Sequence, residues 1–282
     1  MKIRMMKHAW LLCLFTILTS VNTNYGQRIS RDSIMQFVKT TSSFTIYKDN
    51  YIITGTKAGV MPETSNSDLK QQISFKHRLS KPTLPLDSYL FITYTQKSFW
   101  DIYKWSSPFK EINFNPGAGL GKLLFKDEKL IGSLALQVEH ESNGLGGNSE
   151  KGSRGWNLVS ASYSMFTSPR SVLQLKAWLP FQYKKDNPDL MEYVGYGQAA
   201  YTWEIKKSKL LFEVAGRKGA SWSWKGNIRT QLSYNPFKSG NTFITLQWYQ
   251  GYAESLLHYR ESTSMLRLGM AIKPSNLLLY LY

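Results

Sequence analysis

The sequence has little cysteine and no long apolar run after its first residues, and both absences limit the possible folds. Its single cysteine, Cys13, lies near the N-terminus, so a framework of disulfide bonds is excluded. A transmembrane helix needs about 20 consecutive apolar residues, and no segment after Gly26 approaches that length. Neither covalent cross-links nor membrane-spanning helices are therefore expected to define the fold.

Acidic residues are also scarce. The chain has 19 Asp and Glu against 35 Lys and Arg, which gives a formal charge of +16. The basic residues are scattered along the chain and form no single patch, so nucleic acid is not expected as a partner. An exported protein that meets anionic lipid headgroups can be basic for that reason alone.

The first residues have the pattern of a cleaved signal peptide, assigned to residues 1–26. Lys2, Arg4 and Lys7 give a positive start, and a short apolar run follows before the expected cleavage site after Gly26. Without these three basic residues the formal charge falls from +16 to +13. The pattern predicts export from the cytoplasm.

After an N-terminal extension at residues 27–43, apolar and polar residues alternate in one segment after another. A period of two is typical of β-strands with one apolar face. The expected strands are Phe44–Thr54, Gln71–Leu79, Tyr89–Trp100, Glu111–Phe125, Lys129–Glu141, Asn157–Phe166, Ser171–Pro180, Tyr193–Ile205, Lys209–Arg217, Asn227–Tyr234, Thr242–Tyr252 and Met265–Ile272. At roughly ten residues each, they have the length that a tilted strand needs to cross a bilayer.

The connections between these strands differ in length. Short ones such as Lys206–Ser208 alternate with long ones such as Ser142–Trp156, and 14% of all residues are aromatic. Short turns at one end, long loops at the other and aromatic girdles are typical of outer-membrane barrels. The sequence predicts an all-β fold, a single antiparallel transmembrane β-barrel of about 12 strands over residues 44–282, in the outer membrane of a Gram-negative-type cell.

Alternation returns at the C-terminus, where Leu278, Tyr280 and Tyr282 have the form of a barrel-assembly signal. The chain runs past the last expected strand through Lys273 and Pro274. Residues 276–282 either complete that strand or form a tail after it.

Three polar residues interrupt the apolar faces of two neighbouring strands. His140 and Ser142 share the face of Leu134, Leu136 and Val138, because side chains on a strand switch faces at every residue. In an antiparallel hairpin with both apolar faces on one side, Asn157 returns beside them. A hydroxyl, an imidazole and a carboxamide together favour a Ser–His–Asn hydrolase. The alternative is a set of polar residues at a barrel rim, although an unpaired polar group on an apolar face is costly.

Seven ordered motifs make the sequence similar to the outer membrane phospholipase A family, from about Phe44 to about Ile272. They are YTQKSFWDIY, SSPFKE, NFNP, HESNG, SRGWN, DNPDLMEYVGY and YQGYAESLLHY, which begin at Tyr94, Ser106, Asn113, His140, Ser153, Asp186 and Tyr249. The resemblance implies a 12-stranded barrel with a catalytic triad on its lipid-facing wall. Ser142 is the implied nucleophile, His140 the base and Asn157 the residue that orients His140.

The same resemblance implies a catalytic calcium ion and an oxyanion site. Ser106, Ser153 and the carbonyl of Leu145 occupy the calcium-ligand positions, and the backbone amides of Ser142 and Gly144 the oxyanion positions. The family usually has arginine where Leu145 stands, and the loop from Gly144 to Ser153 is longer here. Leucine is compatible with a ligand that is only a carbonyl oxygen, because calcium accepts oxygen ligands in flexible geometry.

Gln96 lies on the same strand face as Leu90, Ile92 and Tyr94, where its amide would point into lipid. The resemblance implies a hydrogen bond to the same residue of a second barrel, in a homodimer. The inward-facing charges, such as Lys176, Glu213 and Arg267, are expected to fill the barrel as a network.

The predicted function is a calcium-dependent phospholipase A1/A2 of the outer membrane that hydrolyses acyl esters of glycerophospholipids. A lipid A deacylase is an alternative, since such a barrel also presents His-x-Ser on its outer wall, but its third member is a carboxylate where this chain has Asn157. A passive pore is the non-enzymatic alternative. It gives no reason for three hydrogen-bonding residues on the lipid face.

Overall fold

The computed structural model describes residues 29–146, 152–237, 240–274 and 277–281. The predicted signal peptide, residues 1–26, lies outside the described residues. Among the residues that the structure describes, no helix is long and apolar enough to cross a membrane.

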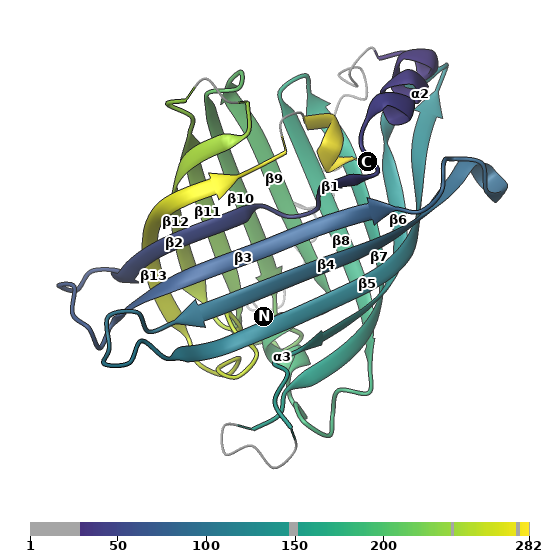
Figure 1. Ribbon diagram of the computed structural model, residues 1–282. Helices are drawn as coiled ribbons and strands as arrows, with labels where there is room; N and C mark the ends of the chain where they lie inside the picture. The colour runs from purple at the N-terminus through teal and green to yellow at the C-terminus, as the bar shows by residue number, and fades with distance from the viewer. Residues whose placement is uncertain (1–28, 147–151, 238–239, 275–276, 282) are drawn as a thin grey trace, which may run out of the picture.

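Twelve antiparallel strands form the closed barrel in the described part of the chain (Figure 1). They are β2 (Asn50–Lys57), β3 (Ser67–Arg78), β4 (Ser88–Trp100), β5 (Phe109–Lys126), β6 (Lys129–Ser142), β7 (Gly155–Ser168), β8 (Ser171–Phe181), β9 (Gly197–Lys206), β10 (Leu210–Lys218), β11 (Gly226–Tyr234), β12 (Thr242–Gly251) and β13 (Thr263–Ile272). Each strand pairs with the next, and β13 pairs with β2. Closure leaves the sheet without a free edge, as a strand fold in lipid requires. The predicted barrel is confirmed.

The first expected strand, Phe44–Thr54, is present in two pieces. The short strand β1 (Phe44–Ile46) and β2 both pair with β3, and Tyr47–Asp49 separates them. Asp49 forms a buried ion pair with Lys273, the residue that follows β13. This ion pair fixes the segment between β1 and β2 against the end of β13.

The strand expected at Tyr193–Ile205 begins later than predicted. The helical turn α3 (Met191–Val194) precedes it, and β9 starts only at Gly197. Gly195 ends the turn with a φ of 65°, a conformation that a β-branched or bulky residue rarely adopts. Tyr193 is buried in a cluster with Trp178 and Tyr259, so packing in the loop region outweighs the local alternation.

The two faces of the barrel wall follow the predicted alternation. On β6, Leu136 and Val138 are 61% and 54% exposed on the outer surface, whereas Gln137 and Glu139 are each 4% exposed in the interior. A polar interior and an apolar exterior are the normal arrangement of a membrane barrel.

Buried ion pairs fill the interior, as the sequence predicted. Arg267 binds Asp68 at 2.7 Å and Glu254 at 2.7 Å, and Lys70 binds Glu254 at 2.9 Å. Burial alone would raise the pKa of Glu254, but Lys70 and Arg267 lower it to about 2, so the carboxylate stays ionised at neutral pH. Lys176 pairs with Glu139, and Arg229 pairs with Glu213.

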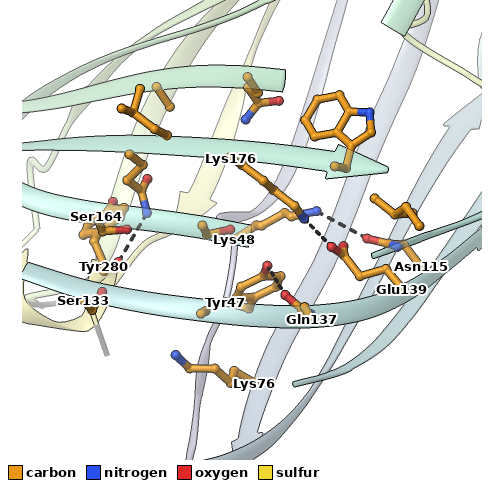
Figure 2. Close-up of a pocket in the computed structure, with 18 of the residues that line it drawn as sticks. Tyr47, Lys48, Lys76, Asn115, Ser133, Gln137, Glu139, Ser164, Lys176 and Tyr280 are labelled. Carbon is orange, nitrogen blue, oxygen red and sulfur yellow. Dashed lines mark hydrogen bonds and ion pairs between the residues drawn. The ribbon is translucent and has the colours of Figure 1, made fainter. Parts of the chain in front are cut away.

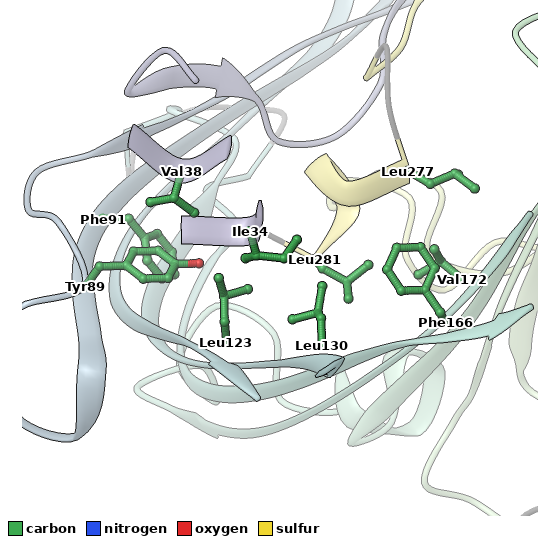
Figure 3. Close-up of a cluster of buried hydrophobic side chains, with 10 residues drawn as sticks. All are labelled: Ile34, Val38, Tyr89, Phe91, Leu123, Leu130, Phe166, Val172, Leu277 and Leu281. Carbon is green, nitrogen blue, oxygen red and sulfur yellow. The ribbon is translucent and has the colours of Figure 1, made fainter. Parts of the chain in front are cut away.

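Both ends of the described chain pack inside one mouth of the barrel. The N-terminal extension contains the helix α2 (Arg31–Thr40). Of the two alternatives for the C-terminal residues, the structure shows a tail after the last strand, which contains the 3-10 turn η3 (Leu277–Tyr280); Asn276 and Tyr282 lie outside the described residues. Pro274, which cannot donate a ladder hydrogen bond, follows the last strand. The cluster that joins them contains Ile34, Val38, Tyr89, Phe91, Leu123, Leu130, Phe166, Val172, Leu277 and Leu281 (Figure 3).

Ile34→Asp is expected to release α2 from this mouth. Ile34 is 2% exposed, and an unpaired carboxylate in its apolar site costs about 3 kcal/mol or more. Limited trypsin digestion in detergent should then cut at Arg31 and Lys39 at least several-fold faster than in the wild type. Gln36→Asp, at an exposed position of the same helix, is the matched control. Equal protection of the two variants would contradict the docking of α2.

Candidate active site

His140 and Ser142 end strand β6 on the outer wall, at the side of the long loops. His140 is exposed and Ser142 half-buried, and both lie on the face that Leu136 and Val138 share. The β6–β7 register places Asn157 directly opposite His140. The structure therefore brings the three predicted residues to one point of the outer surface.

A hydrogen bond joins the imidazole to the carboxamide. His140 Nδ1 lies 2.9 Å from Asn157 Oδ1, so the ring donates its Nδ1 proton to this oxygen. In that tautomer Nε2 carries the lone pair and is free to act as a base. The Asn157 Nδ2 group donates to Gln182 Oε1 at 3.1 Å, which extends the chain of amides by one residue.

Ser142 borders the same small space as the imidazole. A Cβ atom placed on Gly155 would lie 3.4 Å from Ser142 Cβ and 3.8 Å from His140 Cε1. Among the described residues, His140 forms a side-chain hydrogen bond with Asn157 but none with Ser142. In enzymes without bound substrate such bonds are often long and tighten only in the complex.

The backbone of His140 is fixed by the neighbouring strand β5. In the β5–β6 pair, Phe114 lies opposite Ser142 and Gly117 lies opposite Glu139, so Pro116 falls opposite His140. Proline has no N–H and cannot donate a hydrogen bond between the two strands at this point. The Asn115 side chain instead donates to the His140 carbonyl at 3.0 Å. This contact gives the NFNP motif a structural role that the sequence did not suggest.

Gly144 stands in the turn that follows β6 and has a φ of 66°. A Cβ at this position would lie 2.7 Å from Cε2 of Phe114, so both the backbone conformation and the packing favour glycine. The predicted oxyanion residue Gly144 therefore stands in a turn directly beyond the end of β6.

Asn143 joins the two sides of the loop that carries the expected calcium ligands. Its Oδ1 accepts from the backbone N–H of Leu145 at 3.3 Å and of Arg154 at 3.0 Å. Its Nδ2 donates to the Gly152 carbonyl at 3.1 Å, and its side chain is buried. The backbone of Leu145 and both neighbours of Ser153 are thus tied to Asn143, a residue that the sequence analysis did not identify.

The third expected ligand, Ser106, is exposed in the β4–β5 loop with a φ of 62°. Among the described residues no hydrogen bond joins its side chain to Leu145 or Ser153. Within the same residues no three His, Cys, Asp or Glu side chains gather where they could hold a metal ion. Any metal here would depend on hydroxyl and carbonyl oxygens, which fit calcium and not a soft transition metal.

The β8–β9 loop is fixed against the start of β7, beside Asn157. Asn187 donates to the Gly155 carbonyl at 2.7 Å, and Arg154 donates to the Asp186 carbonyl at 2.9 Å. Asp189 is paired with Arg260 at 2.8 Å. Burial would raise the pKa of Asp189, but hydrogen bonds from Arg260 and Tyr259 lower it, so this anchor stays charged at neutral pH.

Gln96 lies on the outer face of β4, half-buried. Its Oε1 accepts from the Tyr94 hydroxyl at 3.0 Å, and its Nε2 donates to Ser98 at 3.4 Å. A single barrel therefore provides partners for both ends of this amide.

The interior holds a cavity of about 260 Å³ that is separate from the candidate site. Charged and polar side chains line it, among them Lys48, Glu139 and Lys176 (Figure 2). Neither His140 nor Ser142 is among its lining residues. The candidate site thus opens to the outside of the wall, where lipid lies.

Comparisons with known proteins agree with this architecture. The family model described as Phospholipase A1 matches residues 27–272. Phospholipase A1 of Salmonella typhimurium and of Escherichia coli K12 are each 30% identical over 214 residues, which cover 73% of this chain and 69% of theirs.

Solved structures agree as well. The calcium-bound dimer of the outer membrane phospholipase of Salmonella typhi superposes with a TM-score of 0.72 at 25% identity, over 87% of this chain and 99% of that one. The outer membrane phospholipase A of Escherichia coli gives a TM-score of 0.71 at 24% identity, over 82% and 98%. The resemblance suggested by the motifs is confirmed, and the chain belongs to the phospholipase A1 family.

Proposed function

We propose that this protein is a calcium-dependent phospholipase of the outer membrane that hydrolyses acyl esters of glycerophospholipids by a Ser–His–Asn mechanism. The single observation that carries the proposal is the hydrogen-bonded pair His140–Asn157 beside Ser142 on the outer wall. An ester bond of a membrane lipid can reach this site from the bilayer itself.

In the proposed reaction Ser142 attacks the ester carbonyl while Nε2 of His140 takes the hydroxyl proton. Asn157 holds the imidazole in the required tautomer and, being neutral, adds no second charge beside lipid. The amides of Ser142 and Gly144 stabilise the oxyanion. The alcohol leaves with the proton from His140, and a water molecule deprotonated by His140 then releases the fatty acid from Ser142.

The donor set fits calcium in part. Asn143 binds the backbone of Leu145 and the backbones of Gly152 and Arg154, which flank Ser153, and a carbonyl and a hydroxyl are ligands that calcium accepts. The Salmonella typhi relative binds calcium as a dimer. When bound, the ion would polarise the ester carbonyl. Ser106 is the third expected ligand.

Purified protein in mixed micelles tests the function directly. The expected products from a glycerophospholipid are a lysophospholipid and a free fatty acid, detected by mass spectrometry. Release of acyl chains from lipid A alone would support the deacylase alternative. Ion conductance in planar bilayers without any hydrolysis would support the pore.

The dimer is proposed from the relative and from the shape of the site. The outer wall of a single barrel can contact an acyl chain of the substrate on one side only. A second barrel packed against this wall would enclose the acyl chain between two apolar surfaces. The outer faces of β4 to β7 expose Ile92, Leu120, Leu136 and Val159 for such contact. Because both walls already lie in lipid, packing and hydrogen bonds must supply the preference for the dimer.

Gln96→Ala is expected to weaken dimerisation and to lower activity several-fold at dilute protein, with recovery at a high protein-to-detergent ratio. A Gln96–Gln96 contact would contribute on the order of 1 kcal/mol, and the existing partners Tyr94 and Ser98 keep the effect at this modest size. Activity against protein concentration and sedimentation in density-matched detergent measure it. Wild-type protein that is monomeric during turnover, with specific activity independent of concentration, would refute the pairing.

A further inference from the structure

We propose that Gln182 is a positioning residue of the active site, which fixes the orientation of the Asn157 amide and through it the tautomer of His140. The inference deepens the proposed function and rests on it. Its basis is the pair of bonds on one carboxamide, from Asn157 Nδ2 to Gln182 Oε1 at 3.1 Å and between Asn157 Oδ1 and His140 Nδ1 at 2.9 Å.

An asparagine in this role has a weakness that an aspartate lacks. A carboxylate presents an acceptor to the imidazole whichever way it turns, whereas a carboxamide presents an acceptor on one side and a donor on the other. If the Asn157 amide turned over, its NH₂ group would face His140 Nδ1. The proton would then belong on Nε2, and His140 could not take the proton of Ser142.

Gln182 opposes this turn because its Oε1 accepts the hydrogen bond that the amino group of Asn157 donates. The Asn157 amide can turn over only if that bond breaks or if Gln182 turns with it. The coupling adds the cost of a lost hydrogen bond to any turn of Asn157 alone, since a turned Asn157 facing an unturned Gln182 would set two acceptors against each other.

The backbone around Gln182 is held in place for this contact. Phe181, the preceding residue, is the register partner of Asn157 in the β7–β8 pair. The β8–β9 loop is then tied back to β7 by the Asn187 bond to the Gly155 carbonyl at 2.7 Å. Gln182 itself has a φ of 50°, an uncommon conformation for a residue other than glycine, asparagine or aspartate, and this conformation persists between two anchored segments.

The test uses Gln182→Met, which keeps the length of the side chain and removes the acceptor. Loss of one hydrogen bond is expected to lower kcat about five-fold, with KM for phospholipid within two-fold of wild type. Lys185→Met, at an exposed position of the same loop, is the matched control and should retain full activity.

Gln182→Glu provides the rescue. A carboxylate can only accept, so it should hold the Asn157 amide at least as well as glutamine, with kcat at the optimum within two-fold of wild type. Its negative charge favours the protonated imidazole, so the acidic limb of kcat/KM should move to higher pH. A role of Gln182 in packing alone would not give a loss of kcat with methionine and its recovery with glutamate, whereas the pH shift follows from the added charge in either case.

Repeating Gln182→Met in the Asn157→Asp variant shows whether its effect comes from the orientation of the side chain at position 157 or from another cause. A carboxylate at position 157 has no wrong orientation, so adding Gln182→Met there should cost less than two-fold. Full activity of Gln182→Met in the wild-type background, or an equal loss in both backgrounds, would overturn the inference. Ser142→Ala is assayed beside them, because its retained activity would refute the proposed function instead.

Discussion

Ser142→Ala is expected to lower phospholipid hydrolysis by at least about 10³-fold while leaving a folded barrel. The hydroxyl is the only candidate nucleophile of the proposed triad, and its removal leaves no atom to form the acyl-enzyme. The residual rate would come from binding and oxyanion stabilisation alone. Release of fatty acid from a phospholipid in mixed micelles measures the loss.

The fold of the variant is checked by the heat-dependent shift in gel mobility that closed barrels show. Ser142 is half-buried on the outer wall, and alanine keeps its backbone pairing with Phe114 and Gly155, so the shift should be unchanged. Ser162→Ala is the matched control, because Ser162 lies on the inner face of the neighbouring strand β7 and lines the interior cavity. A Ser142→Ala protein with wild-type activity would end the serine-hydrolase proposal.

Asn157→Ala is expected to cost less than Ser142→Ala. It removes the oxygen that accepts from His140 Nδ1, so the base is misoriented but not lost. The order of the two losses is itself informative, because a site that used Asn157 as a direct reactant would lose as much as the serine variant.

The position of the proposed triad could be predicted because strand geometry leaves little freedom. Side chains alternate at every residue, and a slip of one residue would turn Leu136 and Val138 into the polar interior. With the faces fixed, His140 and Asn157 had to return on one side of the β6–β7 hairpin, as their register shows.

The supporting residues could not be predicted in the same way. Gln182 and Asn143 lie beyond the ends of their strands, where no period defines a direction, and their contacts depend on loop paths. At Asn143 the sequence indicated only a turn, because asparagine is common in turns, and it did not indicate which backbone groups the side chain binds. Gln96 was expected to find its partner in a second barrel, but two neighbours on its own strand face, Tyr94 and Ser98, also form hydrogen bonds with its amide.

The helix α2 is a different case, because its signals are present in the sequence. Ser30 caps the helix by accepting from the N–H of Ser33, and Ile34 and Val38 have the spacing of one helical face. The mouth of the barrel supplies the apolar surface against which that face packs, and this surface exists only once the strands have closed.

Removal of calcium is expected to abolish turnover, and added calcium to restore it. The proposed ligands are hydroxyl and carbonyl oxygens without a carboxylate among them, so affinity should be low and a chelator such as EGTA should strip the ion readily. Magnesium should not replace calcium, because it demands a smaller and more rigid octahedral site. Fatty acid release is measured in EGTA and then across a calcium titration.

Ser153→Ala tests the site itself and should raise the calcium concentration for half-maximal activity at least about ten-fold, with the maximal rate largely recovered at saturation. Leu145 offers only its carbonyl, and Asn143 holds that backbone, so a side-chain change at Leu145 should leave the calcium requirement within about two-fold. Ser162→Ala again serves as the control on β7.

If EGTA-treated protein hydrolyses phospholipid at the full rate, calcium has no part in the reaction. If calcium is required but Ser153→Ala titrates as wild type does, the ion binds elsewhere than between Leu145 and Ser153.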